Sequence, residues 1–86
     1  MRHELKTWPI YYDAIASGTK RFEIRKDDRP FRVGDTLLLR EWEPRSETYT
    51  RRRCAVRVTW ILRDAEYFGL QRGFVAMSIV REPKGA

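Results

Sequence analysis

The stretch GTKRFEIR, residues 18–25, decides how the first half of this chain folds. Gly18 suits the left-handed backbone position that follows the last turn of a helix, so it predicts a helix end. The alternating FEIR segment predicts a strand with hydrophobic side chains on one face and charged side chains on the other. The stretch also brings Lys20, Glu23 and Arg25 within six residues, either as a binding or catalytic cluster or as the solvated face of that strand.

The sequence before this stretch predicts a strand followed by a helix. HELKT, residues 3–7, alternates polar and apolar residues and places Leu5 on the inner face. TWPIYYDAIASG, residues 7–18, has Pro9 where a first helical turn accepts proline, and it ends on glycine. The aromatic and apolar face of this helix comprises Trp8, Tyr11, Tyr12 and Ile15.

Three further strands are predicted downstream. TLLLREW is an apolar run short enough to form a strand covered on both faces, and FVAMSIV has the composition of a last strand. RRRCAVRVTWIL predicts a long strand in which Val56, Val58 and Trp60 alternate with polar residues. These strands cover residues 36–42, 51–62 and 74–80, with a tight turn at 32–35, a hairpin loop at 43–48 and one helical turn within 63–73.

Length and composition predict one small folded domain. The chain has 86 residues, too few for two cores, and 42% of them are hydrophobic, which is enough for a modest core. About five strands and one clear helix predict a mainly β (α+β) fold with one or two helices. A small, curved mixed sheet in the form of a partly closed barrel would bury both faces of such strands. We expect residues 1–86 to form this domain, with residues 82–86 as a flexible tail.

The charge of the chain favours an anionic partner. Lysine and arginine number 18 against 12 aspartates and glutamates, so the formal net charge is +6. Arginine supplies most of the positive charge, and its planar guanidinium suits phosphate and base recognition better than a lysine ammonium does. A small basic domain of this kind most often binds nucleic acid. General solubility explains the composition equally well.

The sequence predicts neither a metal site nor a cofactor. His3 and Cys54 are the only soft metal ligands, and a structural zinc site needs about four. Cys54 lies in an apolar strand segment and is expected to be a small buried hydrophobe. The chain shows no signal-peptide pattern and no apolar run near about 18 residues, so we expect no membrane contact and a cytoplasmic location.

The order of these segments resembles a known family. HELKTWPIYYDAIASGTKRFEIRKDDRPFRVGDTLLLREW, residues 3–42, closely resembles the opening of the DUF3850 family. GTKRFEIR matches the GxKxxExR signature of the wider ASCH superfamily, and GLQRGFVAMSIV, residues 69–80, resembles the closing strand of the family. The resemblance implies a PUA-like β-barrel of five to six strands, related to the PUA, EVE and YTH domains. Several of those domains bind RNA or modified bases in a cleft beside the first helix.

This resemblance predicts the function less directly than the fold, because proteins with the same barrel fold include both RNA-binding proteins and hydrolases. The superfamily includes enzymes that deacylate N4-acetylcytidine and a member reported to be a ribonuclease. In the amidohydrolase members a catalytic lysine matches Lys20, but their nucleophilic threonine corresponds to Glu23. A glutamate provides no hydroxyl, so the threonine mechanism does not carry over. Those enzymes use a further glutamate downstream, and Glu66 is one candidate for its equivalent.

Three functions therefore remain open. The favoured one is binding of RNA or a modified nucleotide in a cleft lined by the GxKxxExR motif. The second is a small hydrolase acting on modified cytidine or RNA, in which Lys20 and Glu23 are catalytic. The third is a basic regulatory protein that binds an acidic protein partner. The sequence leaves the oligomeric state open.

Several other residues have a structural and a functional interpretation. Trp8 is expected to anchor the helix in the core, although it could stack on a base. Asp28 and Arg29 suit a turn, whereas Arg29 could also reach the cleft. His3 is expected to be a structural residue. Arg51, Arg52 and Arg53 follow the 43–48 hairpin loop and are solvated by default or hold phosphates. The candidate ligand-binding or nucleic-acid-binding residues are Lys6, Trp8, Lys20, Glu23, Arg25, Arg29, Arg51, Arg52 and Arg53.

Overall fold

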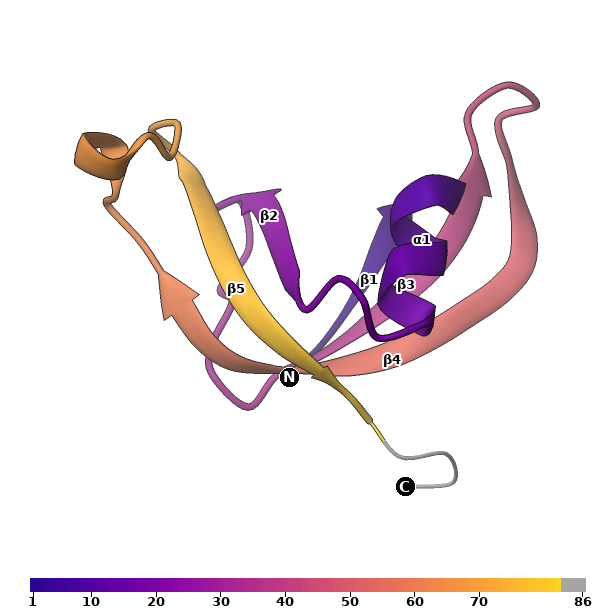
Figure 1. Ribbon diagram of the computed structural model, residues 1–86, viewed down its shortest axis with the longest axis horizontal. Coiled ribbons are helices and arrows are strands. Elements are labelled where there is room, and N and C mark those ends of the chain that lie inside the picture. The colour runs from indigo at the N-terminus through magenta and orange to yellow at the C-terminus, as the bar shows by residue number, and fades with distance from the viewer. Residues whose placement is uncertain (83–86) are drawn as a thin grey trace.

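The computed structural model describes residues 1–82, and they form a curved sheet with one α-helix. Figure 1 shows the sheet bent into two arms, with β2 and β5 in one arm and β1, β3 and α1 in the other. The predicted mainly β fold with a partly closed barrel is confirmed. The elements are β1 (Arg2–Thr7), α1 (Pro9–Ala16), β2 (Phe22–Lys26), β3 (Thr36–Glu43), β4 (Thr48–Leu62), the short 3₁₀ helix η1 (Glu66–Phe68) and β5 (Phe74–Arg81).

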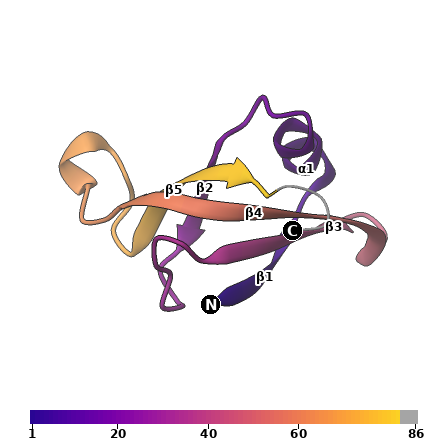
Figure 2. The ribbon, with the colours of Figure 1, turned by 90° about the horizontal axis from the view of Figure 1, so that it is seen from below.

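The strand order is β1-β3-β4-β5-β2. β1 runs parallel to β3, with Leu5 opposite Leu39, and the other neighbours are antiparallel. β1 and β2 are therefore the two edges of the sheet, and the curvature turns these edges toward each other. Figure 2 shows α1 standing off the strands on one side of the sheet. No helix within residues 1–82 is both long and apolar enough to cross a bilayer.

The helix has the ends that the sequence predicts. Trp8 is its N-cap, with an extended backbone, and Pro9 occupies the first turn, where its missing N–H is not needed. Gly18 follows the helix with φ of 83°, a left-handed conformation that costs glycine little. The tight turn at 32–35 is confirmed as well, because the Asp35 N–H donates to the Arg32 carbonyl at 3.0 Å.

The core lies between the inner face of the sheet and α1. Leu37, Leu38 and Leu39 are all buried, which confirms that β3 is covered on both faces. Cys54 is buried as predicted, and burial raises the pKa of its thiol. The main cluster consists of Leu5, Tyr12, Ile15, Phe31, Leu37, Leu39, Cys54, Val56, Val58, Val75, Met77 and Ile79.

The alternation predicted for β4 stops at a bulge. Val56 and Val58 are buried, but Trp60 is 60% exposed. The pairing with β5 shifts between Val58 and Trp60, so an extra residue is inserted there. Because side chains alternate with a period of two, this insertion turns Trp60 outward and lets Ile61 pack against the core.

The lone histidine has a structural position, as predicted. His3 Nε2 donates to Asp35 Oδ2 at 2.8 Å, and its ring packs against Phe31 with centroids 4.8 Å apart. Burial alone would raise the pKa of Asp35. Hydrogen bonds from His3, the α-amino group of Met1 and the Arg32 backbone N–H outweigh burial and lower that pKa to about 2.

The chain end beyond β5 is described only as far as Glu82. Its N–H donates to the Ala55 carbonyl at 3.0 Å, and its carboxylate accepts from Thr36 Oγ1 at 2.6 Å. The first residue of the expected flexible tail is therefore held against β3 and β4. The rest of that expectation, residues 83–86, lies outside the described residues.

Candidate functional site

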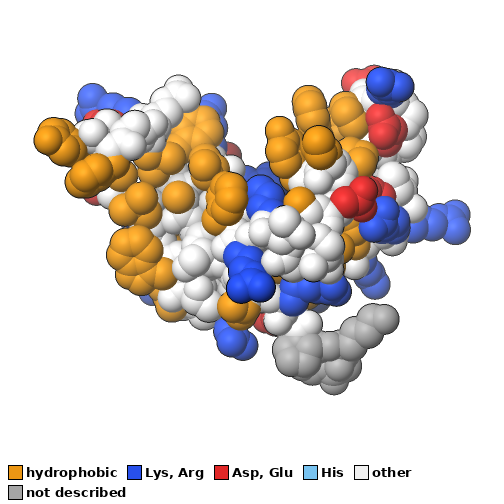
Figure 3. All heavy atoms as spheres, in the orientation of Figure 1, with side chains coloured by type: hydrophobic (Ala, Val, Ile, Leu, Met, Phe, Trp, Pro, Cys, Tyr) orange, Lys and Arg blue, Asp and Glu red, His pale blue; other side chains and the backbone are white. Residues whose placement is uncertain are grey.

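A cleft of about 560 Å³ lies between the start of α1 and β2. Figure 3 shows it as a notch between the two arms, with hydrophobic side chains on both walls and basic side chains at the base. The edges β1 and β2 both contribute to it, so the cleft occupies the opening where the barrel does not close. Its lining residues are Lys6, Thr7, Trp8, Tyr11, Lys20, Phe22, Glu23, Ile24 and Arg25.

The charged residues of the GxKxxExR motif meet in this cleft. Lys20 Nζ donates to Glu23 Oε1 at 2.9 Å and to the Phe22 carbonyl at 2.7 Å. Arg25 Nε donates to Glu23 Oε2 at 2.7 Å. Glu23 is only 3% exposed, so the interpretation of these charges as a solvated strand face is wrong. Lys20 reaches the same side as Glu23 because it precedes β2 and is not bound by the alternation of the strand.

Arg25 also joins the two edges of the sheet. Its Nη1 donates to the Lys6 carbonyl at 3.1 Å, and its Nη2 donates to Thr7 Oγ1 at 3.3 Å. One step along β1, Arg29 Nη1 donates to the Glu4 carbonyl at 3.1 Å. Edge strands leave carbonyls unpaired, and these guanidinium groups satisfy two of them on β1.

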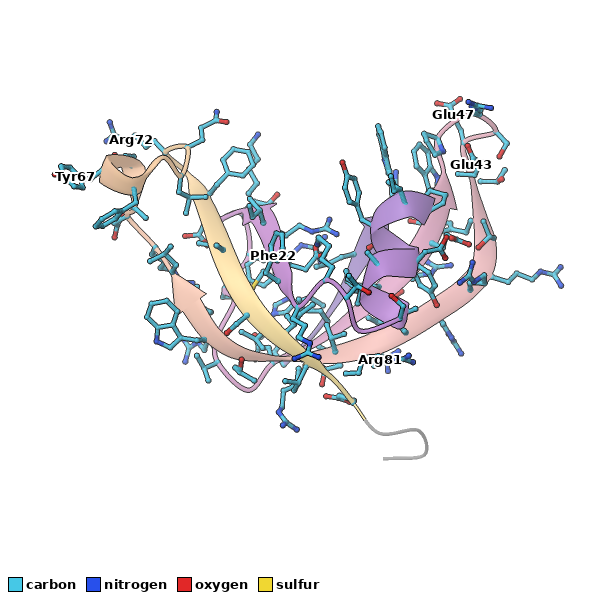
Figure 4. All side chains as sticks on the ribbon, viewed as in Figure 1. Phe22, Glu43, Glu47, Tyr67, Arg72 and Arg81 are labelled. Carbon is cyan, nitrogen blue, oxygen red and sulfur yellow. The ribbon has the colours of Figure 1, made fainter. Side chains whose placement is uncertain are left out.

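The walls of the cleft are aromatic and aliphatic. Trp8 and Tyr11 come from the start of α1, whereas Phe22 and Ile24 come from β2. Figure 4 shows Phe22 extending into the space between the arms. All four side chains are about half exposed, which makes them available to a ligand.

The expectation that Trp8 anchors the helix in the core is wrong. Trp8 is 51% exposed, and the buried residues of α1 are Tyr12 and Ile15. The reason is local. Trp8 is the N-cap, and its extended backbone directs its side chain independently of the helical face that follows.

The cleft carries more positive than negative charge. Lys6, Lys20 and Arg25 line it, against the single carboxylate of Glu23. Lys6 Nζ lies 4.1 Å from the centroid of the Trp42 ring, and it has no ion pair within residues 1–82. Lys20 has three N–H donors and uses two of them, so one is left for a ligand. The described part of the chain contains no group of three or more His, Cys, Asp or Glu side chains suited to a metal ion.

The remaining candidate residues do not line the cleft. Arg29 bonds to β1 and lies 4.0 Å from Asp28. Arg52 pairs with Asp13 at 3.0 Å and with the buried Glu41 at 3.4 Å, and so ties the β3–β4 hairpin to α1. Arg51 and Arg53 are exposed on that hairpin, and Glu66 is exposed on η1.

Tyr11, Phe22 and Ile24 are wall residues that were not predicted as ligand contacts from the sequence. The signal for Phe22 and Ile24 was present, because they alternate with Glu23 and Arg25. Because Glu23 points toward the barrel interior, its strand neighbours Phe22 and Ile24 must project from the other face of β2. β2 borders the cleft, so this face forms one of the cleft walls.

A phage protein resembles part of this chain. The two are 42% identical over 57 residues, which is 66% of this chain and 50% of the relative. That relative is described as "Uncharacterized 12.9 kDa protein in GpA 3'region" of Escherichia phage P2. The chain therefore spans about half the length of this curated relative.

A family model matches almost the whole described chain. It is the model for "Domain of unknown function (DUF3850)", and the match covers residues 2–79, from β1 to near the end of β5. The match includes every residue that lines the cleft. This chain belongs to the DUF3850 family.

Proposed function

We propose that this protein binds RNA or a modified nucleotide, with a base held in the cleft between α1 and β2. One observation carries the proposal: aromatic walls and a cationic floor occur in the same cleft. The volume of about 560 Å³ lies in the range of small-molecule sites. A base needs a flat apolar surface and a few polar contacts at its edge, and this cleft supplies both.

The walls would hold the base by stacking. Trp8 and Tyr11 stand on one side of the cleft, and Phe22 stands on the β2 side. Stacking of a base on an aromatic side chain contributes about 1–3 kcal/mol in proteins that bind single strands. This contribution depends little on the identity of the base, so the polar floor would determine specificity.

The polar side chains at the floor of the cleft would form hydrogen bonds to the base edge or to a phosphate. The free N–H of Lys20 can donate to a base carbonyl or to a phosphate oxygen, and Lys6 can do the same. Glu23 is almost fully buried, with both carboxylate oxygens accepting from cations. Its main role would therefore be to orient Lys20 and Arg25.

The GxKxxExR signature supports this proposal. It resembles that of the ASCH superfamily, whose PUA-like relatives include RNA binders with a cleft beside the first helix. Here α1 is the first helix, and its N-terminal end forms one wall of the cleft. An RNA ligand would also place the protein in the cytoplasm.

The geometry favours binding over hydrolysis. A general base must reach the proton that it removes, but Glu23 is almost fully buried and its two oxygens are held by Lys20 and Arg25. Glu23 also lacks the hydroxyl group of the threonine that acts as nucleophile in the amidohydrolases with a similar motif. The aromatic walls likewise fit a base better than they fit an acidic protein.

Fluorescence titration with single-stranded RNA hexamers of each base, together with a panel of modified nucleosides, tests the proposal. We expect binding that weakens with salt, and Lys20→Gln should lower the affinity about tenfold, as expected for loss of a charge-assisted hydrogen bond. Arg72→Gln removes the same charge from the far tip of the arm formed by β2 and β5 (Figure 4) and should change little. Absence of binding to the whole panel, or equal effects of the two variants, would contradict the proposal. Turnover of N4-acetylcytidine that Lys20→Ala abolishes would favour the hydrolase instead.

A further inference from the structure

A second hollow of about 350 Å³ adjoins the cleft. It lies between the end of α1 and the end of β5, and Lys20 lines both hollows. The side chains at its rim include Arg21 and Arg81, whereas its interior is formed by aliphatic residues such as Ile15 and Ile79.

Arg21 and Arg81 are held in place by backbone carbonyls instead of by carboxylates. Arg81 Nη1 donates to the Ala16 carbonyl at 2.7 Å, and Arg21 Nε donates to the Gly18 carbonyl at 3.0 Å. The Ala16 carbonyl belongs to the C-terminal end of α1, where positive charge is favoured, and Gly18 lies two residues beyond it. Neither guanidinium group forms an ion pair within residues 1–82, and no Asp or Glu lines the hollow.

Helix capping alone leaves most of these donors unused. A guanidinium group has five N–H donors, and each of these two arginines donates only one of them to the helix end. The others are available for a bidentate contact with a phosphate, the anion whose geometry guanidinium fits best.

The two hollows follow one another on the same face of the molecule. Figure 4 places Arg81 at the base of the sheet, below the opening between the arms. Figure 3 shows basic side chains at the base of the notch and again below it on this face. Lys20 lies at the boundary between the two hollows, because it lines both of them.

We infer that the ligand is a single RNA strand longer than one nucleotide, with one base in the cleft and a neighbouring phosphate on Arg21 and Arg81. This inference rests on the proposed function and deepens it. The strand passes across Lys20, which contacts it at the boundary between the two hollows. A free nucleoside or mononucleotide would use only the first hollow.

The test compares ligand lengths in two variants. Affinities are measured for the four nucleoside 5′-monophosphates and the four matching RNA homohexamers, and the comparison is made for the base that binds best. The wild type should bind the hexamer at least tenfold more tightly than the monophosphate, as added phosphate contacts predict. Arg21→Gln/Arg81→Gln should remove most of that difference and leave the monophosphate affinity unchanged. It should also reduce the salt slope by about 0.7 for each phosphate that the protein no longer neutralises.

Two controls keep the outcome interpretable. The single variant Arg21→Gln, at an exposed side chain, should give a partial loss even if the double variant folds poorly. Arg72→Gln should leave the hexamer affinity within twofold of wild type, because a distant charge is screened.

If Arg72→Gln weakens hexamer binding as much as the double variant does, general charge explains the binding and the inference fails. If hexamer and monophosphate bind equally, the inference fails while the proposed function stands. If neither binds, the proposed function itself fails.

Discussion

Two regions of this protein carry similar charged residues and use them differently. In the cleft, Glu23 is buried and accepts hydrogen bonds from Lys20 and Arg25, beside open space. In the β3–β4 hairpin, Glu41 is equally buried, but Thr50 and Arg52 satisfy it, and it lines neither of the two hollows described above.

The difference between these regions lies in the backbone around each carboxylate. Glu23 lies on an edge strand of the sheet, next to the opening of the barrel. Glu41 lies on β3, which has a partner on each side, and β4 bulges opposite it between Arg40 and Trp42. A buried, paired carboxylate is therefore a candidate for function only where the fold leaves space beside it.

The sharpest test of this comparison replaces each carboxylate in turn. Glu23→Ala leaves two cations without their partner and should destabilise the fold by about 3 kcal/mol, the lower end of the range for breaking a buried pair, because both cations are partly exposed. Glu41→Ala should destabilise it by a similar or smaller amount. Urea unfolding measures both effects.

RNA titration of the folded fraction then separates the two regions. Only Glu23→Ala should weaken binding, since only Glu23 orients a residue of the cleft floor. If Glu41→Ala weakens binding equally, the distinction between the regions is wrong.

The next largest effect concerns the edges of the barrel. Arg25→Ala removes the bonds to Lys6 and Thr7 together with the bond to Glu23, and should destabilise the fold by about 1.5–2 kcal/mol, the lower part of the range for hydrogen bonds to charged groups. Arg25→Lys keeps the charge but lacks the planar fork, so it should restore stability only in part. Equal stability of Arg25→Lys and wild type would show that charge alone joins the edges. Denaturant midpoints of the three proteins decide the point.

A third buried carboxylate, Asp35, provides a reference, because it bonds to His3 and the α-amino group and lines neither hollow. Its pKa is about 2 in the folded protein, lowered from 3.8, so its stabilising contribution is complete above about pH 4 and is lost as the pH falls toward 2. This lowering of the pKa corresponds to roughly 2–3 kcal/mol. Asp35→Asn should flatten the loss of stability between pH 4 and pH 2, as measured by urea unfolding at each pH. An unchanged acid profile would show that another group is responsible.

The smallest effects are expected at the exposed arginines of the hairpin. Arg51 and Arg53 have no ion pair within residues 1–82, so Arg53→Gln should change stability by less than about 0.5 kcal/mol. It should also weaken RNA binding less than Lys20→Gln does. A larger loss than that of Lys20→Gln would show that the hairpin, and not the cleft, is the principal contact. Parallel titrations of the two variants distinguish these results.

The contrast between local preferences and contacts between distant segments explains which parts of the fold were predictable from the sequence. The helix from Pro9 to Ala16 and its glycine end follow from local backbone preferences, and the apolar run in β3 follows from burial on both faces. The outward turn of Trp60 did not follow, because it depends on a bulge between β4 and β5. The exposure of Trp8 depends on an N-cap conformation that composition does not reveal.

Element types, family and the presence of a charged motif can all be inferred from the amino-acid sequence, because they depend on periodicity, turn residues and spacing along the chain. The folded structure was needed to show that Lys20 and Glu23 share a cleft, that Arg25 joins the edges of the sheet and that Phe22 forms part of a wall. These relations connect β1, α1 and β2 across an opening in the barrel. No local preference encodes such an opening, because it arises from the strand order and curvature of the whole sheet.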